Sequence, residues 1–333
     1  MNPEPIIQVK SLSRSYTRHR RASGLKGAIR SFFHRQFDTH EAVKNLSFDI
    51  VEGEFIGFIG PNGAGKTTTM KMLSGVLYPT SGQARVLGYT PQQRRSGFLK
   101  QISFVMGQKD TLFNDLPAME LFLLMRDMYE VSWRDFERAL DMLSDLLDAR
   151  DYLDVPVRQL SLGQRMKCEL IAGLLHMPRV LFLDEPTIGL DVASQKTIRQ
   201  FFRSYNAETG ATILLTSHYL EDIKSLCERI IFIDHGVIRF DGSRRDIMER
   251  YATSVHISFM TGGEKKPDTV ADLERLGAPK YDGATNTYRL HVKRPRAAAV
   301  ARQLLNAYSV TSILIEEPSL EEIVTAMGED RDR

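Results

Sequence analysis

The sequence has few cysteines and no long apolar segment, and both absences narrow what the protein can be. Only Cys168 and Cys227 occur among 333 residues, and no Cys-x-x-Cys pair is present, which argues against a disulfide scaffold or a cysteine-bound metal. No segment approaches the ~20 consecutive apolar residues that a membrane-spanning helix needs. The N-terminus carries Asn2, Glu4 and Gln8 where a signal peptide would need an apolar core. We therefore expect a cytoplasmic, globular protein.

The chain also lacks an excess of charge of one sign. The chain has 44 lysines and arginines and 42 aspartates and glutamates, which leaves a net charge of +2. This balance gives little support for a general attraction to nucleic acid, although it leaves room for a local basic patch. The 42% hydrophobic content is ordinary for a folded protein and excludes a disordered chain. At roughly 150 residues per domain, the length predicts about two domains.

Short apolar runs that alternate with helical patterns predict an α/β core. The runs at 180–183 and 211–216 are compact and largely apolar, as expected of strands buried on both faces of a sheet. Further strands are expected at 9–12, 42–50, 54–59 and 102–106, and helices at 67–74, 165–176 and through much of 112–147, with Pro117 near a helix start.

The pattern of elements changes after Asp241-Gly242. Strands are expected at 254–259, 288–292 and 309–315, with helical stretches at 269–276 and 295–307. We therefore interpret residues 251–333 as a small accessory C-terminal α+β domain, and residues 1–250 as the main domain.

A glycine-rich segment between an expected strand and an expected helix carries the strongest motif. Residues 60–67 fit the pattern G-x-x-x-x-G-K-[ST]. Glycines let backbone N–H groups turn inward around phosphate oxygens, Lys66 can reach the β- and γ-phosphates, and the Thr67 hydroxyl can bind Mg²⁺. The following helix directs its positive end at the same anion. The predicted nucleotide-binding residues are Gly60, Pro61, Asn62, Gly63, Ala64, Gly65, Lys66, Thr67 and Thr68.

Two carboxylates, Asp184 and Glu185, directly follow the apolar run at 180–183. The first suits Mg²⁺ coordination, and the second suits polarising a water molecule for attack on phosphorus. Alone, such a pair is more often a solvated strand end. Because it follows a phosphate loop here, we interpret Asp184 as a metal ligand and Glu185 as the general base.

A third motif, Leu160-Ser161-Leu162-Gly163-Gln164, closely matches the LSGGQ signature of ABC-type ATPases. From residue 6 to about residue 250 the chain resembles this family, and further motifs follow in the expected order. Tyr16 matches the aromatic residue that stacks on adenine, Gln108 the Q-loop glutamine, Asp191 the D-loop aspartate and His218 the switch histidine. By itself, His218 would more often be a packed or surface histidine, and Gln108 an ordinary polar residue.

The resemblance implies a P-loop NTPase core of ABC type, with a helical subdomain at 110–159 and with ATP and Mg²⁺ as cofactors. In this family each ATP lies between the phosphate loop of one subunit and the signature of another. Because the chain has one copy of each motif, the resemblance implies a homodimer, or a heterodimer with a similar subunit. It further implies that His218 holds the γ-phosphate region, that Gln108 senses metal and water, and that Ser161, Gly163 and Gln164 act in trans.

One residue departs from the family pattern, because Leu162 occupies the position of the first signature glycine. Ser161 and Gly163 remain, and they supply the hydroxyl group and the close backbone approach to the γ-phosphate. The same LSLGQ form is found among bacterial exporter ATPases, so the departure is compatible with activity.

The amino-acid sequences of these motifs resemble those of one branch of the family, the exporters, which includes drug, viologen and polysaccharide exporter ATPases. This resemblance implies an ATPase subunit at the cytoplasmic face of the inner membrane that drives export through separate permease subunits, which bind the substrate. The helical subdomain would receive the permease, and methionines there could adapt to it, although such methionines are more often core. The alternative is a non-transport ABC ATPase of nucleic-acid repair or translation. A repair ATPase would need a long coiled coil between the phosphate loop and the signature, and a translation ATPase would need a second phosphate loop.

A basic insertion at 17–38 is not required by the ATPase core. Residues 14–37 contain seven lysines and arginines and no acidic residue. Its apolar residues recur at helical spacing, which predicts an amphipathic helix: Leu25, Ala28, Ile29, Phe32, Phe33 and Phe37. Such a helix suits an anionic membrane surface or a permease contact, but the same apolar face could instead pack on the ATPase core.

Overall fold

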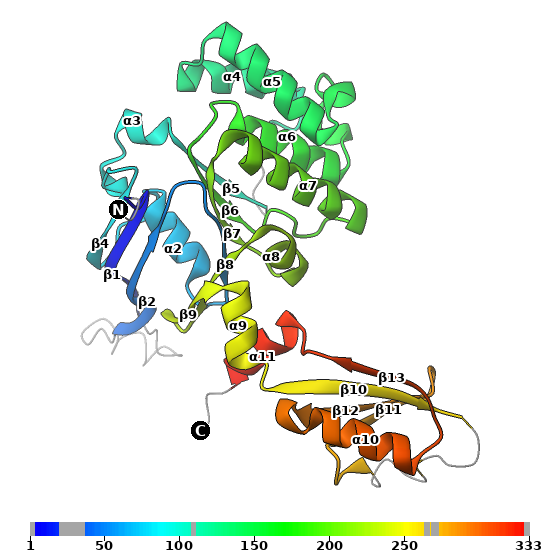
Figure 1. Ribbon diagram of the computed structural model, residues 1–333. Helices are drawn as coiled ribbons and strands as arrows, with labels where there is room; N and C mark the ends of the chain where they lie inside the picture. The colour runs from blue at the N-terminus through cyan, green and yellow to red at the C-terminus, as the bar shows by residue number, and fades with distance from the viewer. Residues whose placement is uncertain (1–3, 20–36, 108–110, 263–266, 268–272, 330–333) are drawn as a thin grey trace, which may run out of the picture. The chain divides into compact units, whose positions relative to one another are not determined.

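Figure 1 shows the protein as a computed structural model, which describes residues 4–19, 37–107, 111–262, 267 and 273–329. The chain divides into two compact units, Met1–Gly242 and Ser243–Arg333. Among the described residues, no helix is both long and apolar enough to cross a bilayer.

The first unit is built around a six-stranded sheet, and its neighbouring strands from β5 to β8 run parallel to one another. Its order is β5 (Ile102–Met106), β6 (Val180–Asp184), β7 (Thr212–Thr216), β3 (Phe55–Ile59), β8 (Arg229–Asp234) and β9 (Val237–Ser243). Strands β3, β6 and β7 are buried along their whole length. Their continuous apolar runs reflect this burial on both faces, as the sequence indicated.

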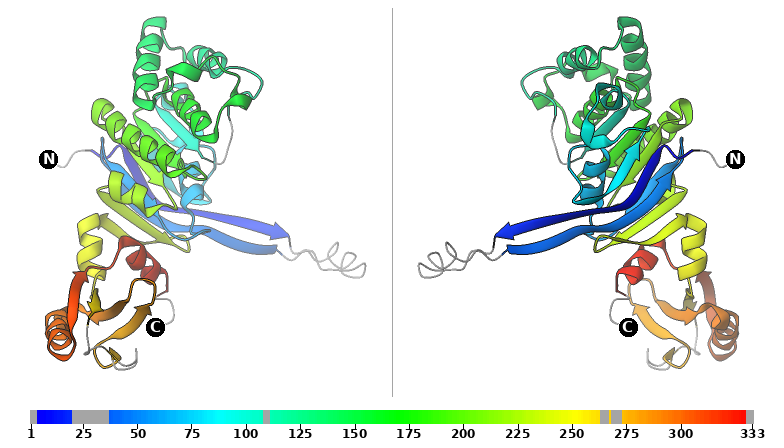
Figure 2. Two further views of the ribbon diagram at one scale, coloured as in Figure 1. Left: turned by 90° about the vertical axis from the view of Figure 1, so that its right-hand side faces the viewer. Right: turned by 90° about the vertical axis from the view of Figure 1, so that its left-hand side faces the viewer.

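A second, three-stranded antiparallel sheet has β1 (Ile7–His19) between β2 (Phe37–Ile50) and β4 (Ser81–Val86). Figure 2 shows β1 and β2 extending together beyond the rest of this unit, and their ladder continues to the pair His19 and Phe37. Both strands are therefore longer than the sequence suggested.

The paired ends of β1 and β2 correct one part of the expected insertion. Residues 17–19 and 37–38 are strand, so Phe37 does not belong to the predicted helix face. Its spacing from Phe33 matched a helix, but its backbone pairs with β1. The other apolar residues of that face, from Leu25 to Phe33, lie outside the described residues.

Helices connect the strands of the first unit, and several begin at a side chain that caps the first turn. The helix α2 (Lys66–Leu73) follows the phosphate loop, and Pro117 directly precedes α4, as its position in the sequence suggested. The remaining helices are α3 (Ser96–Leu99), α4 (Ala118–Tyr129), α5 (Trp133–Leu147), α6 (Leu162–Leu174), α7 (Val192–Thr209) and α8 (Leu220–Leu226). Single 3-10 turns occur at Pro91–Gln93, Arg150–Tyr152 and Val157–Gln159.

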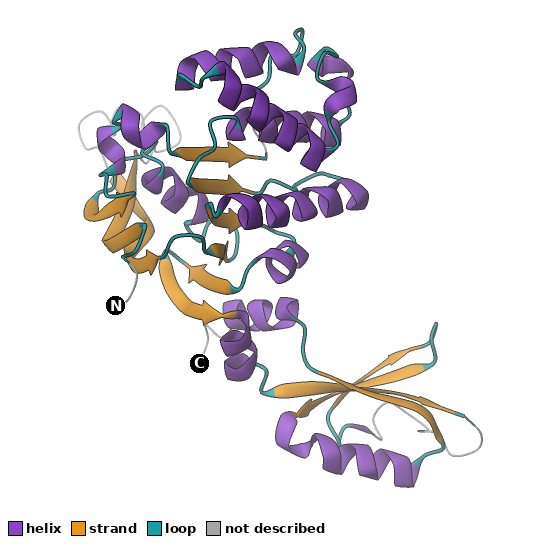
Figure 3. Cartoon of the chain, turned by 45° about the horizontal axis from the view of Figure 1, so that its top comes forward, coloured by secondary structure: helices purple, strands orange, loops and turns teal. Residues whose placement is uncertain are grey.

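The second unit is an α+β fold with a four-stranded antiparallel sheet, ordered β11-β12-β10-β13. Figure 3 shows α10 along one face of this sheet, where Val300 and Leu304 join the buried core. Its elements are α9 (Arg244–Tyr251), β10 (Ser254–Thr261), β11 (Ala278–Asp282), β12 (Thr287–Lys293), a 3-10 turn (Arg294–Arg296), α10 (Ala297–Ala307), β13 (Val310–Glu316) and α11 (Leu320–Glu329). The expected helical stretch at 269–276 falls partly outside the described residues.

Candidate functional site

The phosphate loop connects the end of β3 to the start of α2, and its glycines are required by its shape. Gly60, Gly63 and Gly65 have φ angles of 153°, 79° and 108°, a region that disfavours residues with a side chain. A Cβ atom on Gly60 would lie 1.9 Å from the carbonyl oxygen of Ile233, and one on Gly65 would lie 2.5 Å from that of Ala42. The motif therefore folds as a tight loop that leaves no room for a side chain at Gly60 and Gly65, and the backbone angle at Gly63 favours glycine as well.

Lys66 begins α2 and turns its ammonium group into the loop. Its Nζ donates hydrogen bonds to the carbonyl oxygens of Gly60, at 2.7 Å, and Pro61, at 3.1 Å, and the residue is 7% exposed. Burial lowers the pKa of Lys66, and the nearby charges of Glu185 and Asp184 partly oppose this effect. A buried cation with two carbonyl partners is well suited to receive phosphate oxygens, because they would add charge compensation that water cannot supply there.

Asp184 ends β6 and lies directly beside Thr67 of the phosphate loop. Its Oδ1 accepts hydrogen bonds from Thr67 Oγ1 at 3.1 Å and from Thr216 Oγ1 at 2.7 Å. The two residues expected to hold the metal are thus in contact. A carboxylate, a hydroxyl and the oxygens of a bound phosphate form the kind of ligand set that Mg²⁺ takes, with water completing the shell. These residues therefore fit a magnesium ion.

Glu185 and His218 form a second contact at the same edge of the sheet. The Glu185 carboxylate accepts a hydrogen bond from the backbone N–H of His218 at 2.8 Å, and His218 Nε2 lies 3.3 Å from its other oxygen. Burial raises the pKa of Glu185, while His218 and Lys66 oppose the rise. A buried carboxylate with an increased proton affinity is suited to take a proton from an attacking water.

The backbone also approaches Glu185 closely at Gly107, where a Cβ atom would lie 2.0 Å from the Glu185 carbonyl oxygen. The expected Q-loop residue, Gln108, follows this glycine but lies outside the described residues. Its role as a metal ligand and sensor stays a prediction.

One cavity of about 510 Å³ brings most of the predicted site residues together. Tyr16 lines it together with the phosphate loop, and the Arg14 guanidinium lies 4.8 Å from the centre of the Tyr16 ring. The residues that line it are Tyr16, His40, Ala42, Asn62, Gly63, Ala64, Gly65, Lys66, Thr67, Thr68, Lys71, Met106, Asp184, Glu185 and His218.

Sequence reasoning missed His40 and Thr216, which also belong to this site. His40 is the direct ladder partner of Tyr16, and Thr216 is the ladder partner of Asp184. Both would have followed from the register of the strands, but neither stands in a motif of its own.

The signature residues Ser161, Gly163 and Gln164 do not line the cavity. They form the start of α6 as a capping box, in which Ser161 Oγ accepts from the Gln164 N–H at 3.2 Å and Gln164 Oε1 accepts from the Ser161 N–H at 2.9 Å. Leu162 is 54% exposed between them. They therefore do not contribute to the cavity of their own chain, and their action on the nucleotide of a second subunit stays a prediction.

Asp191, the expected D-loop residue, caps α7 next to the signature. Its Oδ1 accepts from the N–H groups of Ala193 and Ser194, each at 3.0 Å. A Cβ atom on Gly163 would lie 2.5 Å from Ser194 Oγ, so the second signature glycine permits the close approach of α6 and α7. Asp191 therefore has a structural role in this chain and, like the signature, does not line the cavity.

A buried carboxylate that the sequence did not reveal joins the signature helix to the segment after residue 110. Glu169 of α6 is 7% exposed and accepts hydrogen bonds from the N–H groups of Thr111, at 2.8 Å, and Leu112, at 3.1 Å, and from the Thr111 hydroxyl. Its partners lie 57 and 58 residues away, so only the fold identifies them.

Comparisons with known proteins agree with this geometry. Residues 43–188 match the family model described as "ABC transporter". The chain is 31% identical over 297 residues to the daunorubicin/doxorubicin resistance ATP-binding protein DrrA of Streptomyces peucetius, covering 86% of this chain and 87% of DrrA. It is 28% identical over 286 residues to the linearmycin resistance ATP-binding protein LnrL of Bacillus subtilis, covering 84% and 91%.

A similar fold is found in a solved structure, the dimeric post-hydrolysis state of the ATP-binding cassette MJ0796 bound to ADP and Pi. The TM-score is 0.58 at 23% identity, over 71% of this chain and 98% of the cassette. At 23% identity this structure supports the fold alone. The relationship to ABC transporter ATP-binding proteins is supported by the matches to DrrA and LnrL, which extend along most of the chain.

Proposed function

The chain belongs to the ABC transporter family as one of its ATP-binding and ATP-hydrolysing subunits, and we propose that it drives export through separate membrane-spanning subunits. The observation that carries this proposal is the cavity in which the phosphate loop, Asp184, Glu185 and His218 meet. The proposed direction of transport rests on relatives named for resistance to linearmycin and to daunorubicin/doxorubicin. These relatives do not favour the alternative role in nucleic-acid repair or translation.

The proposed active unit contains two such ATPases. Each nucleotide would lie between the cavity of one chain and Ser161, Gly163 and Gln164 of the other, since these residues lie away from the chain's own cavity. The N-terminus of α6, a helix of 13 residues, would direct its partial positive charge at the γ-phosphate. The partner would be a second copy, or a similar subunit in a heterodimer.

Within the cavity, each side chain has a proposed part in positioning or proton transfer. Lys66 and the loop N–H groups would bind the phosphates, and Thr67, Asp184 and Gln108 would hold the metal. Bound Mg²⁺ would neutralise charge on the phosphate oxygens. Glu185 would accept the proton of the attacking water, and His218 would hold Glu185 and the γ-phosphate region. Phosphoryl transfer depends mainly on such positioning and electrostatics.

The helical subdomain at 110–159 is the proposed contact surface for the permease. Exposed large apolar side chains occur there, which is a common property of protein interaction sites. They are Phe113, Leu116, Leu124, Met128 and Trp133, exposed by 42% to 63%. Met128 is the most exposed of them, so at least this methionine is available to a partner. The proposed location is the cytoplasmic face of the inner membrane.

Copurification from solubilised membranes tests this proposal. The tagged full chain is expected to retain a polytopic membrane protein, identified by mass spectrometry, and to hydrolyse ATP in a Mg²⁺-dependent manner. Leu124→Asp with Met128→Asp should weaken retention, because both exposed side chains lie on α4. Leu305→Asp, at a residue of α10 that is 53% exposed, is the matched control and should retain the partner. Copurification with ribosomes or nucleic acid, and with no membrane protein, would contradict the proposal.

A further inference from the structure

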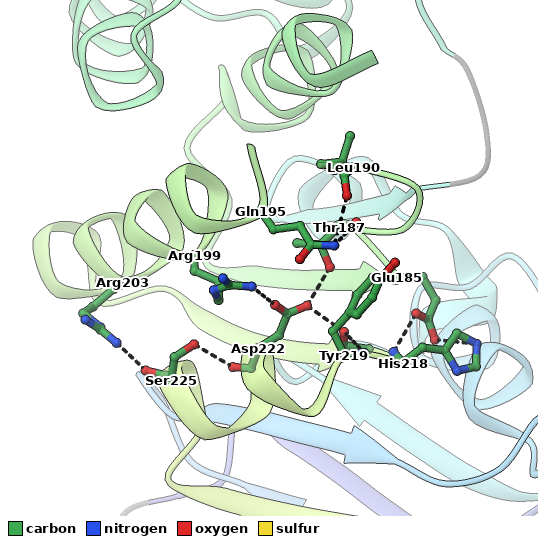
Figure 4. Close-up of polar contacts among 11 residues, drawn as sticks. Glu185, Thr187, Leu190, Gln195, Arg199, Arg203, His218, Tyr219, Asp222 and Ser225 are labelled. Atoms are coloured by element: carbon green, nitrogen blue, oxygen red, sulfur yellow. Dashed lines mark hydrogen bonds and ion pairs between the residues drawn. The ribbon is translucent and has the colours of Figure 1, made fainter. Parts of the chain in front are cut away.

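A buried carboxylate outside the cavity lining, Asp222 of α8, has no part in the functions described above. The residue is 1% exposed and does not line the cavity. Its Oδ2 accepts hydrogen bonds from Thr187 Oγ1 and Ser217 Oγ, each at 2.6 Å, and its Oδ1 accepts from Arg199 Nη1 at 2.8 Å (Figure 4). One carboxylate therefore has three side-chain partners from three separate segments.

These partners lie next to the residues that act in hydrolysis. Thr187 is two positions after Glu185, in the loop that follows β6, and Ser217 directly precedes His218, in the loop that follows β7. Arg199 belongs to α7 and balances the buried negative charge. Asp222 thus connects the loop of Glu185 to the loop of His218 without lining the cavity.

The surrounding hydrogen bonds leave little freedom to this connection. The Ser217 hydroxyl also accepts from the Tyr219 N–H at 3.0 Å, and Gln195 Nε2 donates to the Leu190 carbonyl oxygen at 3.2 Å. Thr187 and Ser217 are themselves 2% and 6% exposed. A buried polar network whose members are paired favours a single geometry, because any other geometry would leave a buried group unpaired.

We propose that Asp222 is a positioning residue for ATP hydrolysis: it fixes the loops of Glu185 and His218 in the relative position that catalysis needs. The contact between the His218 N–H and the Glu185 carboxylate, at 2.8 Å, depends on the relative position of these two loops. A displacement of about 1 Å at a reacting group can cost roughly 100-fold in rate. The inference rests on the proposed roles of Glu185 and His218.

Three variants separate positioning from general stability. Asp222→Asn keeps the shape and removes the charge, while Thr187→Val and Ser217→Ala each remove one hydroxyl donor and keep the pair of Asp222 and Arg199. We expect kcat to fall by about 10- to 100-fold in Asp222→Asn and by a smaller factor in the other two, with the Kd for ATP unchanged. Adding Thr187→Val to Asp222→Asn should lower kcat by less than the product of the two single effects.

Arg203→Gln provides the matched control. Arg203 donates from Nη2 to the Ser225 carbonyl oxygen at 2.6 Å, so it joins the same two helices but contacts neither catalytic loop (Figure 4). This variant should keep the wild-type kcat even where its melting temperature falls. All assays use the full chain, with the folded fraction measured by thermal unfolding.

The outcomes distinguish the inference from the proposed function. If Glu185→Gln is inactive while Thr187→Val and Asp222→Asn keep the wild-type kcat, the inference is wrong and the proposed function stands. If Glu185→Gln itself keeps wild-type turnover, the proposed base is wrong. Should Asp222→Asn fail to fold, Thr187→Val and Ser217→Ala decide, because they retain the buried charge pair. A parallel loss of kcat in Arg203→Gln would also overturn the inference.

Discussion

Replacing Glu185 by glutamine is expected to stop hydrolysis and to leave ATP binding intact. The amide has nearly the shape of the carboxylate, and its oxygen can still accept the hydrogen bond from the His218 N–H, which is 2.8 Å long in the wild type. The phosphate loop is not altered, because its contacts to Lys66 and Thr67 do not involve Glu185. Only the negative charge that receives the proton is lost.

The expected size of the loss follows from the surroundings of Glu185. A positioned general base contributes about 10²- to 10⁴-fold, or about 2.7 to 5.4 kcal/mol at 1.36 kcal/mol per tenfold. Among the described residues that line the cavity, Asp184 is the only other carboxylate, and two hydroxyl groups already donate to its Oδ1. Because the other described carboxylate of the cavity is already engaged, we expect the loss to lie in the upper part of this range.

The same variant should change the pH dependence of stability in a defined direction. Burial raises the pKa of Glu185 above its ordinary value of 4.5, so ionisation of this residue costs folding stability. The cost is absent where the carboxyl is protonated in both the folded and unfolded states, and is fully present above the folded pKa. The melting temperature of Glu185→Gln minus that of the wild type should therefore increase from about pH 4 toward neutral pH.

Phosphate release at saturating ATP measures turnover, and the ATP-induced rise in melting temperature measures binding. The nucleotide-bound variant should also accumulate as a dimer in size-exclusion chromatography. Glu208→Gln, which changes an exposed carboxylate of α7, is the control and should hydrolyse ATP normally. Wild-type turnover in Glu185→Gln would refute the assignment of the base.

Three further predictions concern the second subunit, the base and the insertion. Mixing Lys66→Ala chains with Ser161→Arg chains should give a higher rate of ATP hydrolysis than either variant alone, because a mixed dimer has one site with both defects and one intact site. A mixture as inactive as each variant alone would contradict sites built from two chains. Tyr16→Ala should raise the KM for ATP with little change in kcat, since the stacking of a base on an aromatic ring is worth about 1–3 kcal/mol. Tyr16→Phe should leave the KM unchanged, and equal KM values in both variants and the wild type would exclude the stack. A short Gly/Ser linker in place of residues 20–36, whose flanking residues are ladder partners, should leave ATP-induced stabilisation intact and weaken membrane association or transport coupling. Unchanged transport, or unfolding of the ATPase, would show that the insertion is not a docking element.

The shape of the phosphate loop and the position of Asp184 could be predicted because their constraints are local. Gly60, Gly63 and Gly65 adopt backbone angles that favour glycine, and Lys66 must follow them to reach the loop. Asp184 ends a strand that is buried along its length, so an apolar run marks its position. In each case the sequence signal and the structural requirement lie within a few residues of one another.

Residues that depend on tertiary pairing could not be found in the same way. His40 enters the cavity because β2 pairs with β1, and Thr216 reaches Asp184 because β7 pairs with β6. Glu169 lies in a helical pattern, where nothing in the sequence indicates its hydrogen bonds to Thr111 and Leu112. The helical spacing that ended at Phe37 was misleading for a related reason, because strand pairing with β1 determines the backbone there.

The strand order also separates nucleotide binding from hydrolysis in physical terms. The phosphate loop is one continuous segment after β3, whereas Glu185 follows β6 and His218 follows β7, which lies between β6 and β3 in the sheet. Ligands of open parallel sheets bind at the carboxyl ends of such neighbouring strands. ATP binding thus requires that one loop keeps its own shape, while hydrolysis requires that two loops keep a fixed position relative to each other. A change in packing that shifts the loops after β6 and β7 relative to each other should therefore impair hydrolysis before it impairs ATP binding.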